Sequence, residues 1–266
     1  MTQTATGAGL ERFKYEKPVI EDKPKIIVPL AKSSVLNFHM QVAHEGGETN
    51  LHAHAAMESM WLVLKGRIRF YDGDESMFGE YGPMEGIHIP RAAPYWFESV
   101  GDEDLEVMHI MAVNPAANNT RLNFKPLRGW QAGEVEEDRV FDFSKHQAKP
   151  MASVRYDSPE LGDKIKVTYI LKEDDMLAVS VEKVRNGGGD DGLHTHTGTD
   201  SAWFVLSGGR VRFRTPEGKE IILGEHEGLY IPRGAAYGFV ALDSEEAEVL
   251  HVKARDVTVA NERIDY

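Results

Sequence analysis

The chain has 266 residues, of which 41% are hydrophobic and 27% charged, a composition typical of a globular protein rather than a disordered or fibrous one. The absence of cysteine excludes disulfides and thiolate metal ligands, and a net charge of -13 disfavours nucleic acid and anionic membranes as partners. No segment has the roughly 18 apolar residues of a membrane-spanning helix, and residues 1–9 lack the features of a secretory signal and read as a disordered tail. We therefore expect a cytoplasmic protein that acts on a small molecule.

Short apolar or alternating runs, separated by Gly, Pro and Asp, continue along the whole chain and predict an all-β fold. The first half has predicted strands at residues 35–42, 60–64, 67–71, 86–89, 95–99 and 105–113. The second half repeats their order at residues 177–184, 202–206, 210–214, 228–231, 237–241 and 248–252. This duplication predicts two domains, residues 10–113 and 151–266.

The segment between them, residues 114–150, belongs to neither copy of the repeat. It carries large apolar side chains that can pack on a domain, namely Phe124, Leu127, Trp130 and Phe141. Flexible linkers lack such residues, so we expect an ordered connector.

A pattern of two histidines one residue apart, followed four residues later by a carboxylate, occurs in both halves. It comprises His52, His54 and Glu58 in the first half and His194, His196 and Asp200 in the second. Alternate side chains of a strand lie on one face, so each pair of imidazoles can reach one ion. A short turn would then bring the carboxylate in from the next antiparallel strand. Because Asp200 is one methylene shorter than Glu58, it either falls short of the ion or reaches it through water.

These residues resemble the first motif of the cupin superfamily. The motif positions are occupied by Gly46, His52, His54, Glu58 and Gly66, and by Gly188, His194, His196 and Gly208 with Asp200 in place of Glu. The resemblance covers nearly the whole chain outside the tail and the connector. It implies two tandem jelly-roll β-barrels, the bicupin form, and a metal-dependent enzyme among dioxygenases, decarboxylases, isomerases and hydrolases.

The second cupin motif normally ends in a histidine that supplies a further ligand, but Tyr95 and Tyr237 stand there. Three alternatives are open: a site of two His and one carboxylate, a tyrosine that binds or contacts the metal, or a site completed by another histidine. His109 and His251 are the best candidates for the last, because each is the counterpart of the other in the repeat. Both faces of the strand that carries His109 are largely apolar, so periodicity does not decide whether these imidazoles line the cavity or pack elsewhere.

The leading hypothesis is a non-haem Fe(II) enzyme of the dioxygenase type, because two His and one carboxylate leave coordination positions for substrate and oxygen. Mn, Zn, Ni and Cu also accept these ligands. Tyr95 would lie beside the metal as an acid or a hydrogen-bond donor. The alternatives are a metal-dependent hydrolase, isomerase or decarboxylase, and a non-catalytic binding or storage protein. Barrels of this type commonly form homodimers, and we expect one here.

Overall fold

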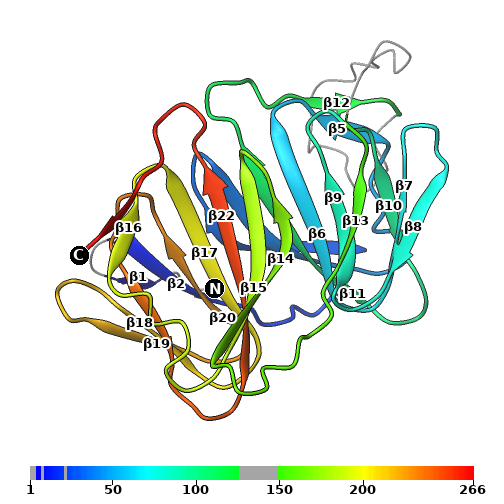
Figure 1. The fold of residues 1–266 in the computed structure, drawn as a ribbon. Coiled ribbons are helices and arrows are strands. Elements are labelled where there is room, and N and C mark those ends of the chain that lie inside the picture. The colour runs from blue at the N-terminus through cyan, green and yellow to red at the C-terminus, as the bar shows by residue number, and fades with distance from the viewer. Residues whose placement is uncertain (1–3, 7–8, 21–22, 126–148) are drawn as a thin grey trace. The chain divides into compact units, whose positions relative to one another are not determined.

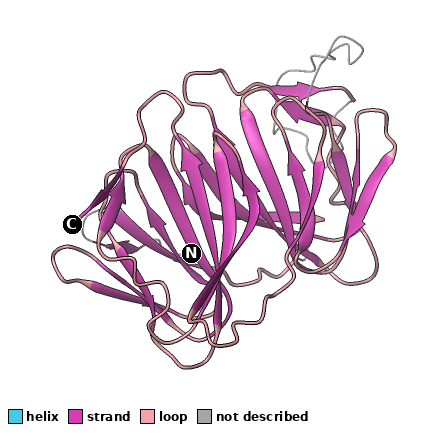
Figure 2. Cartoon of the chain, in the orientation of Figure 1, coloured by secondary structure: helices cyan, strands magenta, loops and turns pink. Residues whose placement is uncertain are grey.

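The computed structural model describes residues 4–6, 9–20, 23–125 and 149–266. All regular elements in these segments are β-strands, so the predicted all-β class is confirmed (Figure 2). The described segments contain no helix that is long and apolar enough to cross a membrane.

The chain divides into two compact units, each built from segments that are separated in the sequence. The first unit consists of Lys17–Pro29 and Phe38–Arg155. The second unit consists of Met1–Glu16, Leu30–Asn37 and Tyr156–Tyr266. The domain boundaries proposed from the repeat remain a prediction.

The first unit contains a large and a small sheet with a hydrophobic cluster between them (Figure 1). The order of the large sheet is β13 (Ala152–Arg155), β9 (Glu85–Ile89), β6 (Met57–Lys65), β11 (Leu105–Val113), β4 (Leu36–Ala43) and β3 (Lys25–Lys32). The small sheet consists of β10 (Trp96–Ser99), β7 (Ile68–Tyr71) and β8 (Met77–Tyr81). A separate two-stranded sheet joins β5 (His52–His54) to β12 (Arg121–Asn123). Trp61 and Ile87 of the large sheet pack with Phe70 and Phe97 of the small one, and we call the space around this cluster the interior.

The second unit repeats this arrangement. Its large sheet has the order β1 (Thr4–Thr6), β2 (Leu10–Lys14), β20 (Glu227–Ile231), β17 (Thr199–Gly208), β22 (Ala247–Arg255), β15 (Leu177–Val184) and β14 (Lys166–Glu173). Its small sheet consists of β19 (Glu220–Leu223), β18 (Val211–Arg214) and β21 (Gly238–Ala241). The remaining pair is β16 (His194–His196) with β23 (Arg263–Asp265). Trp203 lies in the cluster between these sheets, as Trp61 does in the first unit.

Two sequence-based expectations need correction or completion. Thr4–Thr6 forms β1 and pairs with β2, so the expectation of a disordered tail is wrong for this segment. The expected connector contributes β12, and Phe124 is buried beside Leu51. The other three apolar anchors of the connector, Leu127, Trp130 and Phe141, lie outside the described residues.

Candidate functional site

The two imidazoles of the first His-x-His copy lie together in the interior of the first unit. Their ring centroids are 5.1 Å apart, and the ring of His52 lies 4.5 Å from that of Tyr95, a member of the interior cluster. Nδ1 of His52 lies 2.8 Å from the carbonyl oxygen of Asn50. Since a carbonyl can only accept, Nδ1 carries the proton, and Nε2 of His52 keeps the lone pair with which an imidazole binds a metal.

A third imidazole, from β11, faces the same interior. The ring of His109 stacks on the ring of Trp61, with a centroid distance of 3.7 Å and an interplanar angle of 14°. Because Trp61 belongs to the interior cluster, the stacking shows which face of β11 His109 occupies. Nε2 of His109 is buried and has no hydrogen-bond partner among the described residues.

Strand β4 adds two polar side chains that the sequence analysis did not select. Nε2 of His39 lies 3.2 Å from Nδ1 of His109. The amide nitrogen of Gln41 lies 2.9 Å from the same His39 atom and 3.2 Å from the same His109 atom. When Nδ1 of His109 donates to His39, its Nε2 is left with a lone pair for a metal. The available signal was the alternation of three polar residues, Asn37, His39 and Gln41, in an otherwise apolar strand.

Glu58 does not join these imidazoles. Side chains alternate along a strand, and Glu58 is three residues from the inward-facing Trp61, so Glu58 lies on the opposite face of β6 while Ser59 faces the interior. On this outward face Glu58 is only 3% exposed. Its carboxylate accepts hydrogen bonds from Nε2 of His88 at 2.9 Å and from Nε of Arg91 at 3.1 Å. The structure thus contradicts the expected approach of Glu58 to the His pair. Glu58 and His88 are nevertheless a buried carboxylate and imidazole that can take part in holding a metal.

The second unit has the same geometry at its histidines. The rings of His194 and His196 are 5.4 Å apart, and the ring of Tyr237 lies 4.6 Å from that of His194. His251 stacks on Trp203 at 3.6 Å, and its buried Nε2 has no hydrogen-bond partner in the described part of the chain. Three imidazoles and a tyrosine thus line the interior of this unit as well.

Asp200 repeats the behaviour of Glu58. It is three residues from Trp203 and therefore lies on the outward face of β17. Its carboxylate accepts hydrogen bonds from the hydroxyl of Tyr230 at 3.0 Å and from the backbone N–H of Arg233 at 2.9 Å. The expectation that Asp200 would join His194 and His196 is therefore also contradicted.

Burial keeps the interior imidazoles of the first unit neutral. It lowers the pKa of His39 and of His54 to about 3. Burial also lowers the pKa of His52 and of His109 well below 6.5. Burial raises the pKa of Tyr95, so this phenol keeps its proton. Neutral imidazoles with lone pairs are the form in which histidine binds a metal.

These pKa values predict an acid-sensitive fold for the metal-free protein. In the unfolded chain a histidine titrates near 6.5, whereas folded His39 and His54 titrate near 3, so the unfolded state binds more protons between these values. The free energy of unfolding is therefore highest above about pH 6.5, and it decreases as the pH falls toward about 3. We expect urea unfolding to show a loss of at least about 2 kcal/mol from about pH 7 to about pH 5.

The matched variants for this measurement are His39→Gln and His44→Gln. The first should reduce the pH dependence, because it removes one of the buried imidazoles. The second should leave it unchanged, because His44 lies in a partly exposed turn after β4. A stability that does not change over this pH range in the parent protein would contradict the burial of neutral imidazoles.

Comparisons with known proteins agree with this architecture. Residues 180–253 match the family model of the cupin domain. No curated protein matches the sequence. Procruciferin, an 11S globulin from Brassica napus, has 10% identity and a TM-score of 0.63, with 97% of this chain and 87% of that chain covered.

Two enzymes have a similar structure. A mutant of salicylate 1,2-dioxygenase from Pseudoaminobacter salicylatoxidans has 11% identity and a TM-score of 0.63, with 86% of this chain and 75% of that chain covered. A mutant of Bacillus subtilis oxalate decarboxylase has 14% identity and a TM-score of 0.59, with 94% and 78% covered. At these identities the likeness shows the fold and not the activity. Residues 180–253 are therefore a cupin domain, and the chain as a whole has the bicupin fold of two jelly-roll units.

Proposed function

We propose that the first unit binds one divalent metal ion through His52, His54 and His109, and that the chain is a metal-dependent enzyme of the dioxygenase type with a small organic substrate. The observation that carries this proposal is the group of neutral imidazoles in the interior of the first unit. Imidazole ligands accept Fe, Zn, Ni and Cu, and Fe(II) is the ion we place first. The expected homodimer and cytoplasmic location remain predictions.

The donor atoms fit a metal in their chemistry. The backbone contact of His52 is made by Nδ1, so the lone pair on its Nε2 is available to a metal. Nε2 of His109 is buried and has no hydrogen-bond partner among the described residues. The ligand nitrogens of the three histidines are not all within 4.8 Å of one another, so binding of one ion by all three would require their side chains to rotate. The hydrogen bond between His39 and His109 orients the third ligand, as partners of metal-bound imidazoles generally do.

A bound Fe(II) supplies coordination positions at which oxygen and a substrate can meet. The residues of the chain supply the surroundings. Tyr95, protonated and next to His52, can donate a hydrogen bond to a molecule at that position. Trp61 and the cluster around it exclude water from the interior side of the site.

The test uses the full-length chain, loaded anaerobically with Fe(II), and nitric oxide as a stable probe for a position that is open to oxygen. We expect the high-spin paramagnetic signal of an iron-nitrosyl complex, with oxygen consumption in a panel of small aromatic and aliphatic acids. Turnover of a substrate without oxygen consumption would assign the hydrolase, isomerase or decarboxylase alternative. Failure to bind Fe(II) or any of the other ions would leave the non-catalytic alternative, as in the globulin that shares this fold.

A further inference from the structure

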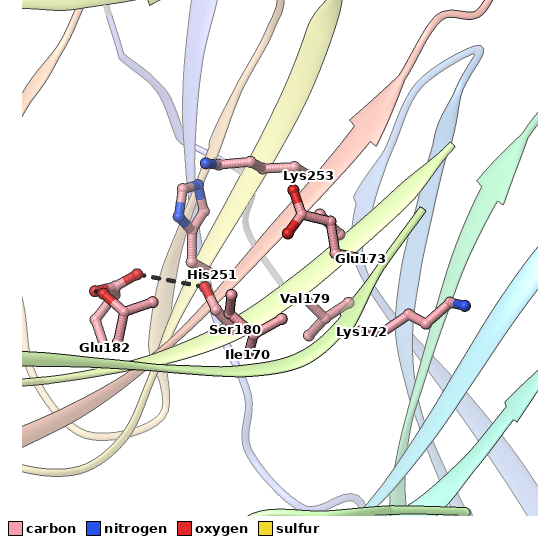
Figure 3. A pocket seen from close by; sticks show the side chains of 10 residues that line it. Ile170, Lys172, Glu173, Val179, Ser180, Glu182, His251 and Lys253 are labelled. Carbon is pink, nitrogen blue, oxygen red and sulfur yellow. Dashed lines mark hydrogen bonds between the residues drawn. The ribbon is translucent and has the colours of Figure 1, made fainter. Parts of the chain in front are cut away.

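A cavity of about 190 Å³ lies in the second unit, between side chains of β14, β15 and β22 (Figure 3). Its polar lining includes Glu182, His251 and Lys253, and its apolar lining includes Ile170 and Val179. Ile170 is 60% exposed, so the cavity opens to solvent on the β14 side. A cavity of about 150 Å³ can hold a benzene ring, which sets the size of ligand that this one can take.

The acidic groups at the cavity already have partners. Glu182 accepts a hydrogen bond from the hydroxyl of Thr168 at 2.6 Å, and Nζ of Lys166 lies 3.4 Å from the same carboxylate. Glu173 lies 3.7 Å from the guanidinium of Arg255. Neither carboxylate therefore needs a cation from a ligand.

Lys253 differs from these groups. Among the described residues, no hydrogen bond or ion pair to its ammonium is found. Figure 3 shows this ammonium beside the ring of His251, whose Nε2 is buried and also lacks a hydrogen-bond partner in the described segments. Burial lowers the pKa of Lys253, while the nearby charges of Glu182 and Glu173 act in the opposite direction.

The first unit keeps a histidine, His109, at the position of His251, but it has different residues at the positions of Lys253 and Ser180. The strand registers that pair His109 with Trp61 and His251 with Trp203 place Met111 and Lys253 at equivalent positions. Ser180 pairs with His251 on β15, where the first unit has His39 beside His109. The interior of the second unit thus has one imidazole fewer than that of the first, and it has an ammonium that the first lacks.

This exchange disfavours a metal in the second unit. Lys253 lies two residues after His251 on the same face of β22, and both side chains line the cavity, so the ammonium lies close to one of the three imidazoles. A divalent cation bound there would be repelled by the ammonium in a poorly solvated interior. An anion would be attracted.

We propose that the cavity of the second unit is a binding site for a small monocarboxylate and holds no metal. The carboxylate lies against Lys253 and His251, and its apolar body lies along Ile170 and Val179. This carboxylate site does not depend on the metal proposed for the first unit, so an experiment can disprove either proposal and leave the other standing.

The probe is sodium benzoate, titrated calorimetrically into the full-length chain. We expect saturable binding of one benzoate per chain and at least a tenfold loss of affinity in Lys253→Met, which installs the residue of the first unit. Lys219→Met, at an exposed turn between β18 and β19, should bind as the parent does. Benzamide, which has the same size without the charge, should not bind, and this comparison needs no variant to fold.

Three results would overturn the proposal: no saturable benzoate binding, equal affinity in Lys253→Met, or equal affinity for benzamide. A second metal ion per chain that is lost on replacing His194 and His196 would also overturn it. The double variant His52→Ala with His54→Ala should keep its benzoate affinity. That result separates this site from the metal site of the first unit.

Discussion

Replacing His52 and His54 together by alanine is expected to remove the metal, with the content falling from about one ion per chain to below about 0.1. Loss of a group that only orients a metal ligand costs about 10–100-fold in affinity, so loss of two direct ligands should exceed that range. Elemental analysis after purification and after Fe(II) loading measures the content, and thermal unfolding verifies that the variant folds.

Two controls make this experiment specific. The double variant His194→Ala with His196→Ala should keep its metal, because the metal is proposed for the first unit and the second unit has the ammonium of Lys253 beside His251. Glu58→Gln should also keep it, because Glu58 lies on the outward face of β6 against His88 and Arg91. If Glu58→Gln loses the metal and the His52 and His54 double variant keeps it, the metal binds on the outward face of β6 and not in the interior.

Gly86→Ala is expected to destabilise the protein by at least about 3 kcal/mol. A Cβ on Gly86 would lie 1.9 Å from the carbonyl oxygen of Trp61, so either β9 or β6 must move. For a chain of this size the melting temperature should fall by roughly 6–12 °C. Trp61 carries the stacked His109, so we also expect weaker metal binding. Circular dichroism during thermal and urea unfolding measures the loss.

Gly82→Ala is the matched control. A Cβ there would lie 3.4 Å from the guanidinium of Arg67, the end of a flexible side chain, and its effect should stay within about 0.5 kcal/mol. At Gly228, the counterpart of Gly86, a Cβ would lie 2.2 Å from the ring of Phe13 and 2.5 Å from the carbonyl oxygen of Trp203, so Gly228→Ala should destabilise the second unit. Equal stability of Gly86→Ala and Gly82→Ala would show that the strand contact is looser than described.

The central strands were predictable because most of their residues are apolar and buried. β11 and β15 have the predicted bounds, Leu105–Val113 and Leu177–Val184. β8 and β14 were not predicted, because residues on both of their faces are partly exposed and the apolar alternation is weak. β12 was hidden in the expected connector, and only its pairing with β5 reveals it.

The repeat predicts the histidines of the candidate site, but the His-x-His spacing does not predict the partners of the carboxylates Glu58 and Asp200. Spacing along the chain suggested that Glu58 follows a turn into the site, whereas its odd separation from Trp61 places it on the other face. That parity was available in the sequence once Trp61 was taken as a core residue. His39 and Lys253 could not be found through the repeat, because each is matched by a different residue type in the other copy.

The exchange of edge strands has a consequence for how this chain arose. β2 lies near the start of the sequence but completes the large sheet of the second unit, and β13 follows the connector but completes the large sheet of the first. A single-copy ancestor that used this strand would have taken it from another molecule, as in domain swapping between identical subunits. Each half of the gene expressed alone would lack the strand that closes its own sheet.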